Sequence, residues 1–204
     1  TGTWTTAATP LATARSQHAM ELLPGGNAVL VIGGVNRQGF VTTAEVFAVD
    51  GSSTTSMPIS IFGNLFRSAL LADGSVLALA DGSTTALRFH PATSTWTTST
   101  FSTTRSLPTL TALADGRVLL AGGSSLNTAE VFNPDFDVWP AAAPMATARR
   151  AASVDLLDGG RGLAHAGRAA FCRPLHLAAL KCGGWRASGC VGDGCLRTRA
   201  QAVQ

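Results

Sequence analysis

Short apolar runs of four or five residues recur along the chain at nearly even spacing, separated by polar segments rich in Gly, Ser, Thr and Asn. Each run follows a Pro-Gly-Gly or Asp-Gly turn, and Asp73, Asp115 and Asp158 of these turns are 42 and 43 residues apart. A turn of this type between two apolar runs is the strongest short-range signal for a β-hairpin, because Gly accepts a positive φ. The pattern therefore predicts a repeated β-hairpin.

The fullest copy of the repeat spans residues 101–139. It contains a Thr-rich lead, an Arg, an apolar stretch, Asp-Gly, a second apolar run, Gly-Gly, a loop, Thr-Ala-Glu-Val-Phe and Trp139. We expect four strands in each copy. Two form the hairpin, at residues 107–113 and 118–121 here, a third ends in the Phe, and an outermost strand carries the Trp.

The other copies depart from this pattern in different ways. The first predicts a hairpin at residues 17–23 and 28–32, and the second has Ala80-Asp81 in place of Gly-Gly. The fourth follows the repeat only to Gly160. Four-stranded units with a period in the forties are typical of a β-propeller blade. We therefore expect an all-β fold, with blades at approximately 5–54, 55–96, 97–139 and a partial 140–160.

The Gly-Gly pair, the aromatic residue about nine positions later and the Trp some seven positions after it resemble the kelch repeat over about residues 1–160. The resemblance implies an incomplete kelch-type β-propeller of about three to four four-stranded blades around a channel, followed by a non-repeat C-terminal tail. The aromatic positions suit inter-blade packing, with sugar stacking as the alternative. The expected structural positions are Gly33, Gly34, Gly122, Gly123, Phe47, Phe89, Phe132, Trp4, Trp96 and Trp139.

Blade number bears on how the chain associates. Closed propellers use about four to eight blades, and residues 1–160 supply fewer than four at this period. We therefore expect an arc of a ring, whose open edges and uncovered faces favour self-association.

Charge is sparse, at 13% of residues, and unevenly distributed. Residues 1–160 carry eight Arg and eleven acidic residues, a net charge of −3, whereas residues 161–204 carry a net charge of +6. A uniformly basic surface for nucleic acid is therefore not expected. No apolar stretch approaches the ~20 residues of a membrane-spanning helix, so we expect no membrane span.

The tail, residues 161–204, holds all four Cys and six of the fourteen Arg, and it lacks the repeat. An out-of-frame translation of GC-rich DNA yields such a composition, and this interpretation predicts poor order or a helix around 174–181. A genuine tail with two disulfides, or an unrelated linker, is an alternative. Zinc is another, although the spacing lacks a tight C-x2-C; its ligands would be Cys182, Cys190, Cys195 and His176.

Some kelch propellers are enzymes, and the best-known are copper radical oxidases similar to galactose oxidase. That resemblance implies redox-active Tyr, a Cys cross-linked to one of them, and His ligands. The chain has no Tyr, and its Cys lie only in the tail. Its four His residues are scattered, and the turn aspartates recur one per copy, as turn chemistry requires. We therefore assign no catalytic residue and expect no cofactor.

Arg15, Arg105 and Arg149 occupy one repeat position. In kelch proteins this position opens the innermost strand beside the channel, which implies a pocket for an acidic peptide or a carboxylated sugar. The alternative is that each Arg pairs with a nearby acid or caps loop carbonyls. The loops after Gly-Gly are the second candidate ligand site, through Asn36, Arg37, Ser124 and Asn127.

The sequence thus favours a non-catalytic module that binds or scaffolds a protein or carbohydrate ligand. We expect it to belong to a larger bacterial-type protein, extracellular or on the cell surface. The first alternative is a fragment of a kelch-type carbohydrate-active enzyme without its catalytic blades. The second is a misread product without function.

Overall fold

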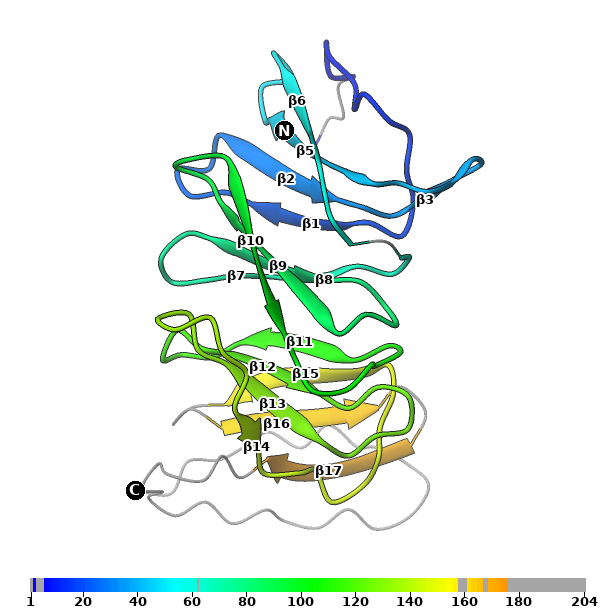
Figure 1. Cartoon of the computed structure of the whole chain (residues 1–204), viewed down its shortest axis with the longest axis vertical. Helices are drawn as coiled ribbons and strands as arrows, with labels where there is room; N and C mark the ends of the chain where they lie inside the picture. Colours follow the sequence, from blue (N-terminus) through cyan, green and yellow to red (C-terminus); the bar gives the residue numbers. More distant parts are fainter. Residues whose placement is uncertain (1, 3–5, 62, 158–160, 167–168, 176–204) are drawn as a thin grey trace.

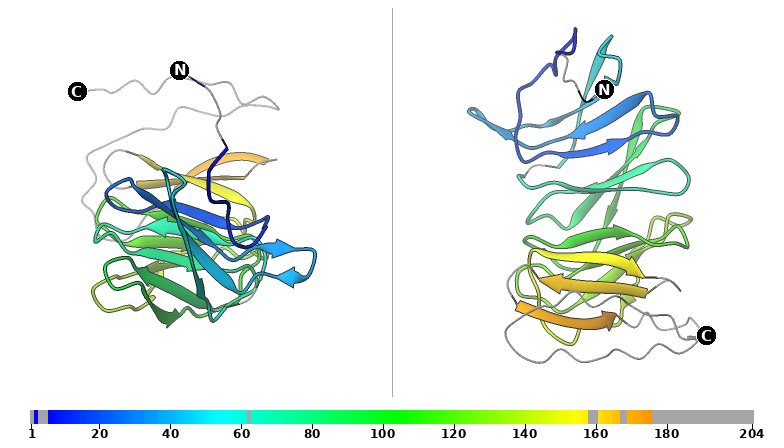
Figure 2. Two further views of the ribbon diagram at one scale, coloured as in Figure 1. Left: turned by 90° about the horizontal axis from the view of Figure 1, so that it is seen from above. Right: turned by 180° about the vertical axis from the view of Figure 1, so that it is seen from behind.

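The computed structural model describes residues 2, 6–61, 63–157, 161–166 and 169–175. Throughout these residues the regular elements are β-strands, and none of them is a helix. The strands form several small antiparallel sheets, which follow one another along the long axis of the molecule (Figures 1 and 2). The predicted all-β class is confirmed.

The first sheet has four strands in chain order. They are β1 (Ala19–Leu22), β2 (Ala28–Ile32), β5 (Thr43–Ala48) and β6 (Thr54–Pro58). A separate two-stranded hairpin, which projects sideways from the stack in Figure 1, interrupts the connection from β2 to β5. Its strands are β3 (Val35–Asn36) and β4 (Gly39–Phe40).

The second and third sheets repeat the four-stranded meander. The second consists of β7 (Arg67–Leu70), β8 (Val76–Leu79), β9 (Thr85–His90) and β10 (Thr95–Thr100). The third consists of β11 (Thr109–Ala112), β12 (Val118–Ala121), β13 (Ala129–Phe132) and β14 (Ala141–Ala142).

A fourth sheet continues past the point where the sequence leaves the repeat. Its three strands are β15 (Ala152–Leu157), β16 (Arg161–Ala166) and β17 (Ala169–Leu175). Pro174 and Leu175 pair with β16, so the helix expected around 174–181 is wrong at these two residues, because an antiparallel neighbour takes up their backbone. The remaining residues of that helix, the four zinc candidates and Trp4 lie outside the described residues.

The Asp-Gly turns close the hairpins as expected. In the second sheet Gly74, at φ 83°, donates its N–H to the Leu71 carbonyl at 3.0 Å. The Asp73 carboxylate accepts the N–H of Ser75 at 2.9 Å. The same turn precedes β12, where Gly116 bonds Leu113 at 3.1 Å. These turns place the β7–β8 and β11–β12 connections on the same side of the stack (Figure 1).

Apolar packing between successive sheets forms the core. In β12 the side chains of Val118 and Leu120 pack toward the second sheet, while Leu119 and Ala121 pack toward the fourth. All four are buried, which explains why this strand is a continuous apolar run rather than an alternating one. The strand β8 is buried on both faces in the same way.

The repeated aromatic residues lie in these inter-sheet cores. Phe89 and Trp96, with ring centroids 4.9 Å apart, pack between the first and second sheets. Phe132 and Trp139, at 5.0 Å, pack between the second and third. Phe47, the equivalent residue of the first sheet, is half-buried. Their contacts match the packing interpretation of the aromatic positions.

One strained backbone position recurs in all four copies. Gln17, Leu65, Leu107 and Ala151 have φ between 49° and 56°, two residues after the Arg position or its equivalent. The carbonyl of Gln17 accepts the N–H of Phe66 at 3.3 Å, and the carbonyl of Leu107 accepts that of Ala151 at 2.9 Å. The left-handed residue thus links one copy to the next across the stack.

Replacing Gln17 with Gly tests the strain at this position. Gln17 is exposed, and Gly removes the penalty of a side chain at positive φ. We expect Gln17→Gly to raise the free energy of unfolding by up to about 1 kcal/mol in urea denaturation. Thr104→Gly, at an exposed position without positive φ, is the control and lowers it by about 0.5–1 kcal/mol. Equal destabilisation by both changes would contradict the assignment.

Candidate functional site

The two repeat arginines Arg15 and Arg105 are inside the protein. The Arg105 guanidinium donates to the carbonyls of Gly122 at 2.7 Å and Thr128 at 3.0 Å, and to Glu130 Oε1 at 3.0 Å. The side chains of Arg105 and Glu130 are 1% and 4% exposed. Arg15 makes the equivalent bonds in the first sheet, including an ion pair with Glu45. Of the two roles expected for this repeat position, these contacts match the pairing of each Arg with an acid and loop carbonyls, because the Nη donors of Arg15 and Arg105 are used within the sheet.

The two glutamates extend this network to the segment that leads into each sheet. Glu130 accepts the backbone N–H of Ser102 at 2.9 Å and its hydroxyl at 3.0 Å. Glu45 accepts the N–H groups of Ala12 at 2.6 Å and Thr13 at 3.1 Å. The Glu of Thr-Ala-Glu-Val-Phe is therefore a buried anchor for the preceding connection.

The Gly-Gly pairs are required by close backbone approaches. A Cβ at Gly122 would meet the Arg149 carbonyl at 2.5 Å, and one at Gly123 would meet the Ser106 carbonyl at 2.9 Å. Gly33 and Gly34 are crowded in the same way, by Phe66 and by the Ser16 carbonyl. The structural role expected for these four glycines agrees with this geometry.

The second copy lacks the whole arrangement. Gly63 occupies the Arg position, and Leu87, which is fully buried, occupies the Glu position. Ala80 stands at the first Gly, and a Cβ on Gly63 would approach its methyl at 2.8 Å. The ion pair and the Gly-Gly pair are thus lost together, which indicates that they act as a unit.

The remaining predicted ligand residues lie on the side of the stack that carries the Gly-Gly pairs, opposite the hairpin turns. Arg149 is half-buried, and its carbonyl accepts the Gly123 N–H at 2.7 Å. Ser124 Oγ accepts the Ser106 N–H at 2.6 Å, and Asn127 donates to the Met145 carbonyl at 3.2 Å. These bonds tie the β12–β13 loop to neighbouring segments of the chain.

Asn36 and Arg37 belong to the separate β3–β4 hairpin between β2 and β5. Asn36 accepts the N–H of Gln38 at 2.9 Å, and Arg37 is exposed. They therefore sit on a different sheet from Ser124 and Asn127, and the structure does not join the two groups into one pocket.

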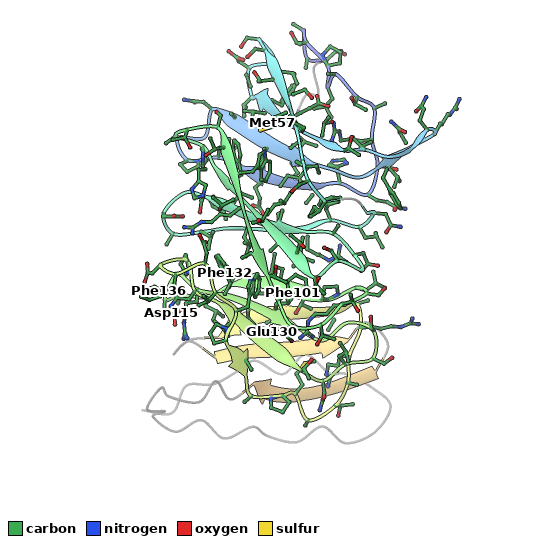
Figure 3. All side chains as sticks on the ribbon, viewed as in Figure 1. Met57, Phe101, Asp115, Glu130, Phe132 and Phe136 are labelled. Atoms are coloured by element: carbon green, nitrogen blue, oxygen red, sulfur yellow. The ribbon has the colours of Figure 1, made fainter. Side chains whose placement is uncertain are left out.

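A polar cavity of about 410 Å³ lies on the opposite side of the stack, at the hairpin turns, between the second and third sheets. It is formed by the β7–β8 turn, the β11–β12 turn, β9 and the β13–β14 loop. Asp115 and Phe136, labelled in Figure 3, lie on this side of the stack. The cavity is lined by Ala72, Asp73, Arg88, Asp115, Gly116, Arg117, Asn133, Pro134 and Asp135.

Arg88 joins the two sheets across this cavity. Its guanidinium donates to Asp73 Oδ2 of the second sheet's turn at 2.6 Å. It also donates to Asp137 Oδ1 at 2.6 Å and to the Pro134 carbonyl at 2.8 Å, both in the β13–β14 loop. A third ion pair, between Arg117 and Asp115 at 2.6 Å, forms another wall.

These contacts set the charge states of the cavity. Burial raises the pKa of Asp73, but the hydrogen bonds from Ser75 and Arg88 outweigh it, and the net shift is downward. The bond from Arg117 lowers the pKa of Asp115. Burial opposes the charge of Arg88, yet Asp137 and Asp73 raise its pKa overall. All three groups stay ionised at neutral pH, which suits binding rather than proton transfer.

Sequence reasoning missed Arg88. Its signal is a departure from the repeat, since Leu87-Arg88 replaces the Glu-Val of the first and third copies. Asp73 and Asp115 were expected only as turn residues, and each does accept a backbone N–H of its own turn. The structure adds that both turns line one cavity, because neighbouring hairpins end at the same side of the stack.

No protein-family model matches the chain, and no curated protein matches it. Among the described residues, no group of three or more His, Cys, Asp and Glu side chains could hold a metal ion. In the same part of the chain, no helix has the length and apolar character needed to cross a membrane.

The buried pair makes a prediction about stability. Arg105→Ala leaves Glu130 buried without its counter-ion, so we expect the free energy of unfolding to fall by about 3–5 kcal/mol. Arg105→Met and Glu130→Leu each leave one partner of the pair buried alone, whereas the double variant removes both charges and should lose less stability than either single change. Urea denaturation of wild type, these two single variants and the double variant measures the coupling. Losses that simply add in the double variant would contradict a coupled pair.

Acid should weaken the contact between the second and third sheets. The pKa of Asp73 in the folded protein lies below its usual 3.8, so its stabilisation is complete above that value and is lost as the pH falls through the folded pKa. Because Asp73 is half-exposed, its contribution stays below about 1 kcal/mol. Wild type and Asp73→Asn should therefore differ in stability at neutral pH and converge in acid. A difference that does not change with pH would refute this.

Proposed function

We propose that this chain is a non-catalytic binding or scaffolding module, built as an arc of a kelch-type β-propeller. Three four-stranded meanders in succession support this architecture. So does the recurrence of equivalent contacts at equivalent repeat positions, including the Arg–Glu pairs and the Phe–Trp pairs. We further propose that it works outside the cell or at its surface, on a protein or carbohydrate ligand.

The cavity between the second and third sheets carries this proposal. Its volume of about 410 Å³ lies within the range of small-molecule sites, about 300–1,000 Å³. Its polar groups come from two sheets and are held in place by the bonds of Arg88. Fixed polar groups around a cavity of this size favour recognition of a ligand by hydrogen bonding.

The enzyme alternative receives less support from this cavity. A general acid or base works best with a pKa near the working pH. The pKa shifts of Asp73 and Asp115 are downward, away from neutrality. We therefore favour binding over sugar turnover as the role of this site.

Filling the cavity tests the proposal. The chain is applied to glycan and peptide arrays, and the best ligand is titrated against Ala72→Trp. Ala72 is exposed and lines the cavity, so the indole should block it with a stability change within about 0.5 kcal/mol. We expect affinity to fall about tenfold or more. Ala146→Trp is the matched control, at an exposed alanine beside Met145, whose N–H bonds the Asn127 carbonyl on the Gly-Gly side of the stack.

Three results would sink the proposal. The first is that no array ligand binds, and the second is that Ala72→Trp and Ala146→Trp bind equally well. The third is steady turnover of a sugar substrate by the purified chain, which would favour the enzyme alternative.

A further inference from the structure

The charges of the cavity are largely neutralised by one another. Arg88 is bonded to both Asp73 and Asp137, and Arg117 is bonded to Asp115 through two nitrogens. An anionic ligand would find both guanidinium groups already occupied by carboxylates. A cationic ligand would find most of the carboxylates paired, with Asp135 the exception among the described lining residues. The described lining residues include two Arg and three Asp, a net charge of −1, which disfavours an anionic ligand. Because Arg88 and Arg117 already pair with Asp73 and Asp115, little of the remaining charge is open to a cation, and an uncharged ligand is favoured.

The lining nevertheless offers hydrogen-bonding atoms of both kinds. Within the described part of the chain, the amide nitrogen of Asn133 and Nη1 of Arg117 donate no hydrogen bond to the protein. The carboxylate of the lining residue Asp135 likewise accepts none there. Donors and acceptors around one cavity match the hydroxyl groups of a ligand, each of which donates and accepts.

An aromatic ring lies in the same loop. Phe136 follows the lining residue Asp135, and 73% of its surface is exposed. Phe136 lies on the same side of the stack as Asp115 in Figure 3. It belongs to neither inter-sheet core, unlike the repeat residues Phe89 and Phe132. An exposed ring beside polar groups offers a flat apolar surface to the C–H face of a sugar.

We propose that this cavity takes an uncharged saccharide, whose ring lies against Phe136 and whose hydroxyl groups bond Asn133, Arg117 and Asp135. The inference rests on the binding function proposed above and names its ligand class. The site lies between the second and third sheets and depends on Arg88, which stands where the first and third copies have Val, so a repeat with Val at this position would lack it.

The test uses the full chain and a panel of neutral methyl glycosides and disaccharides, with N-acetylneuraminic acid and a lysine-rich peptide as charged probes. Binding is followed by calorimetry. We expect a neutral sugar to bind with an affinity that hardly changes between about 0.05 and 0.5 M salt. Phe136→Ala should weaken it about threefold to tenfold, and Phe136→Trp should restore it. Phe40→Ala is the matched control, since Phe40 is 58% exposed on the distant β4.

Asp135→Asn separates the ligand classes. The amide keeps an acceptor oxygen, so we expect a neutral sugar to bind within about threefold of wild type, whereas a cationic peptide would lose its counter-charge. Binding of the lysine-rich peptide or of the anionic sugar, reversed by salt and blocked by Ala72→Trp, would overturn the sugar inference and leave the binding function standing. Binding of a neutral sugar unaffected by Phe136→Ala would overturn it as well. If no probe and no array ligand binds, both the sugar inference and the proposed binding function are contradicted.

Discussion

The structure depends on a guanidinium group buried inside a β-sheet. A buried charge is tolerated only when it is paired and its hydrogen bonds are satisfied. Arg105 is paired with Glu130, and its two Nη atoms also bond the first carbonyl of Gly-Gly and the carbonyl and hydroxyl of Thr128. Its buried Nε has no partner among the described residues. One side chain thereby sets the exit of the second strand, the start of the third and the path of the incoming segment. The repeat motif is the set of residues that this arrangement needs.

The cavity arises where that arrangement is absent. In β9 the Glu position holds Leu87, which packs toward the first sheet, and the next residue, Arg88, points toward the third. Successive side chains of a strand face opposite sides of the sheet. The charged side chain of β9 comes one residue after the Glu position, so it lies at the junction of two sheets and not in the interior of one. The second copy exchanges an internal anchor for a contact with its neighbour.

The sequence predicted the hairpins, the third strand β13 and the packing of Phe132 and Trp139 between sheets, because these depend on turn chemistry and apolar periodicity. For Arg105 it left two roles open, a ligand contact or a bond to an acid and loop carbonyls, and the contacts match the second. It did not identify the partner Glu130, which is 25 residues away. The cavity was beyond sequence reasoning for a related reason. Its walls belong to different copies, and a pattern within one copy says nothing of what faces it across a sheet junction.

The side-chain hydrogen bonds between neighbouring sheets are unevenly distributed. Across the first junction, a side-chain bond joins Ser68 to Glu21 at 2.8 Å, beside the apolar core. The second junction has the Arg88 bonds, a bond from Trp139 to Ser99 at 2.9 Å, and the contact of Asp81 with Ser106 at 3.0 Å. Under mechanical load along the stack, the first sheet would peel away before the second and third separate. The cavity between the second and third sheets would then be retained in the piece that resists longer.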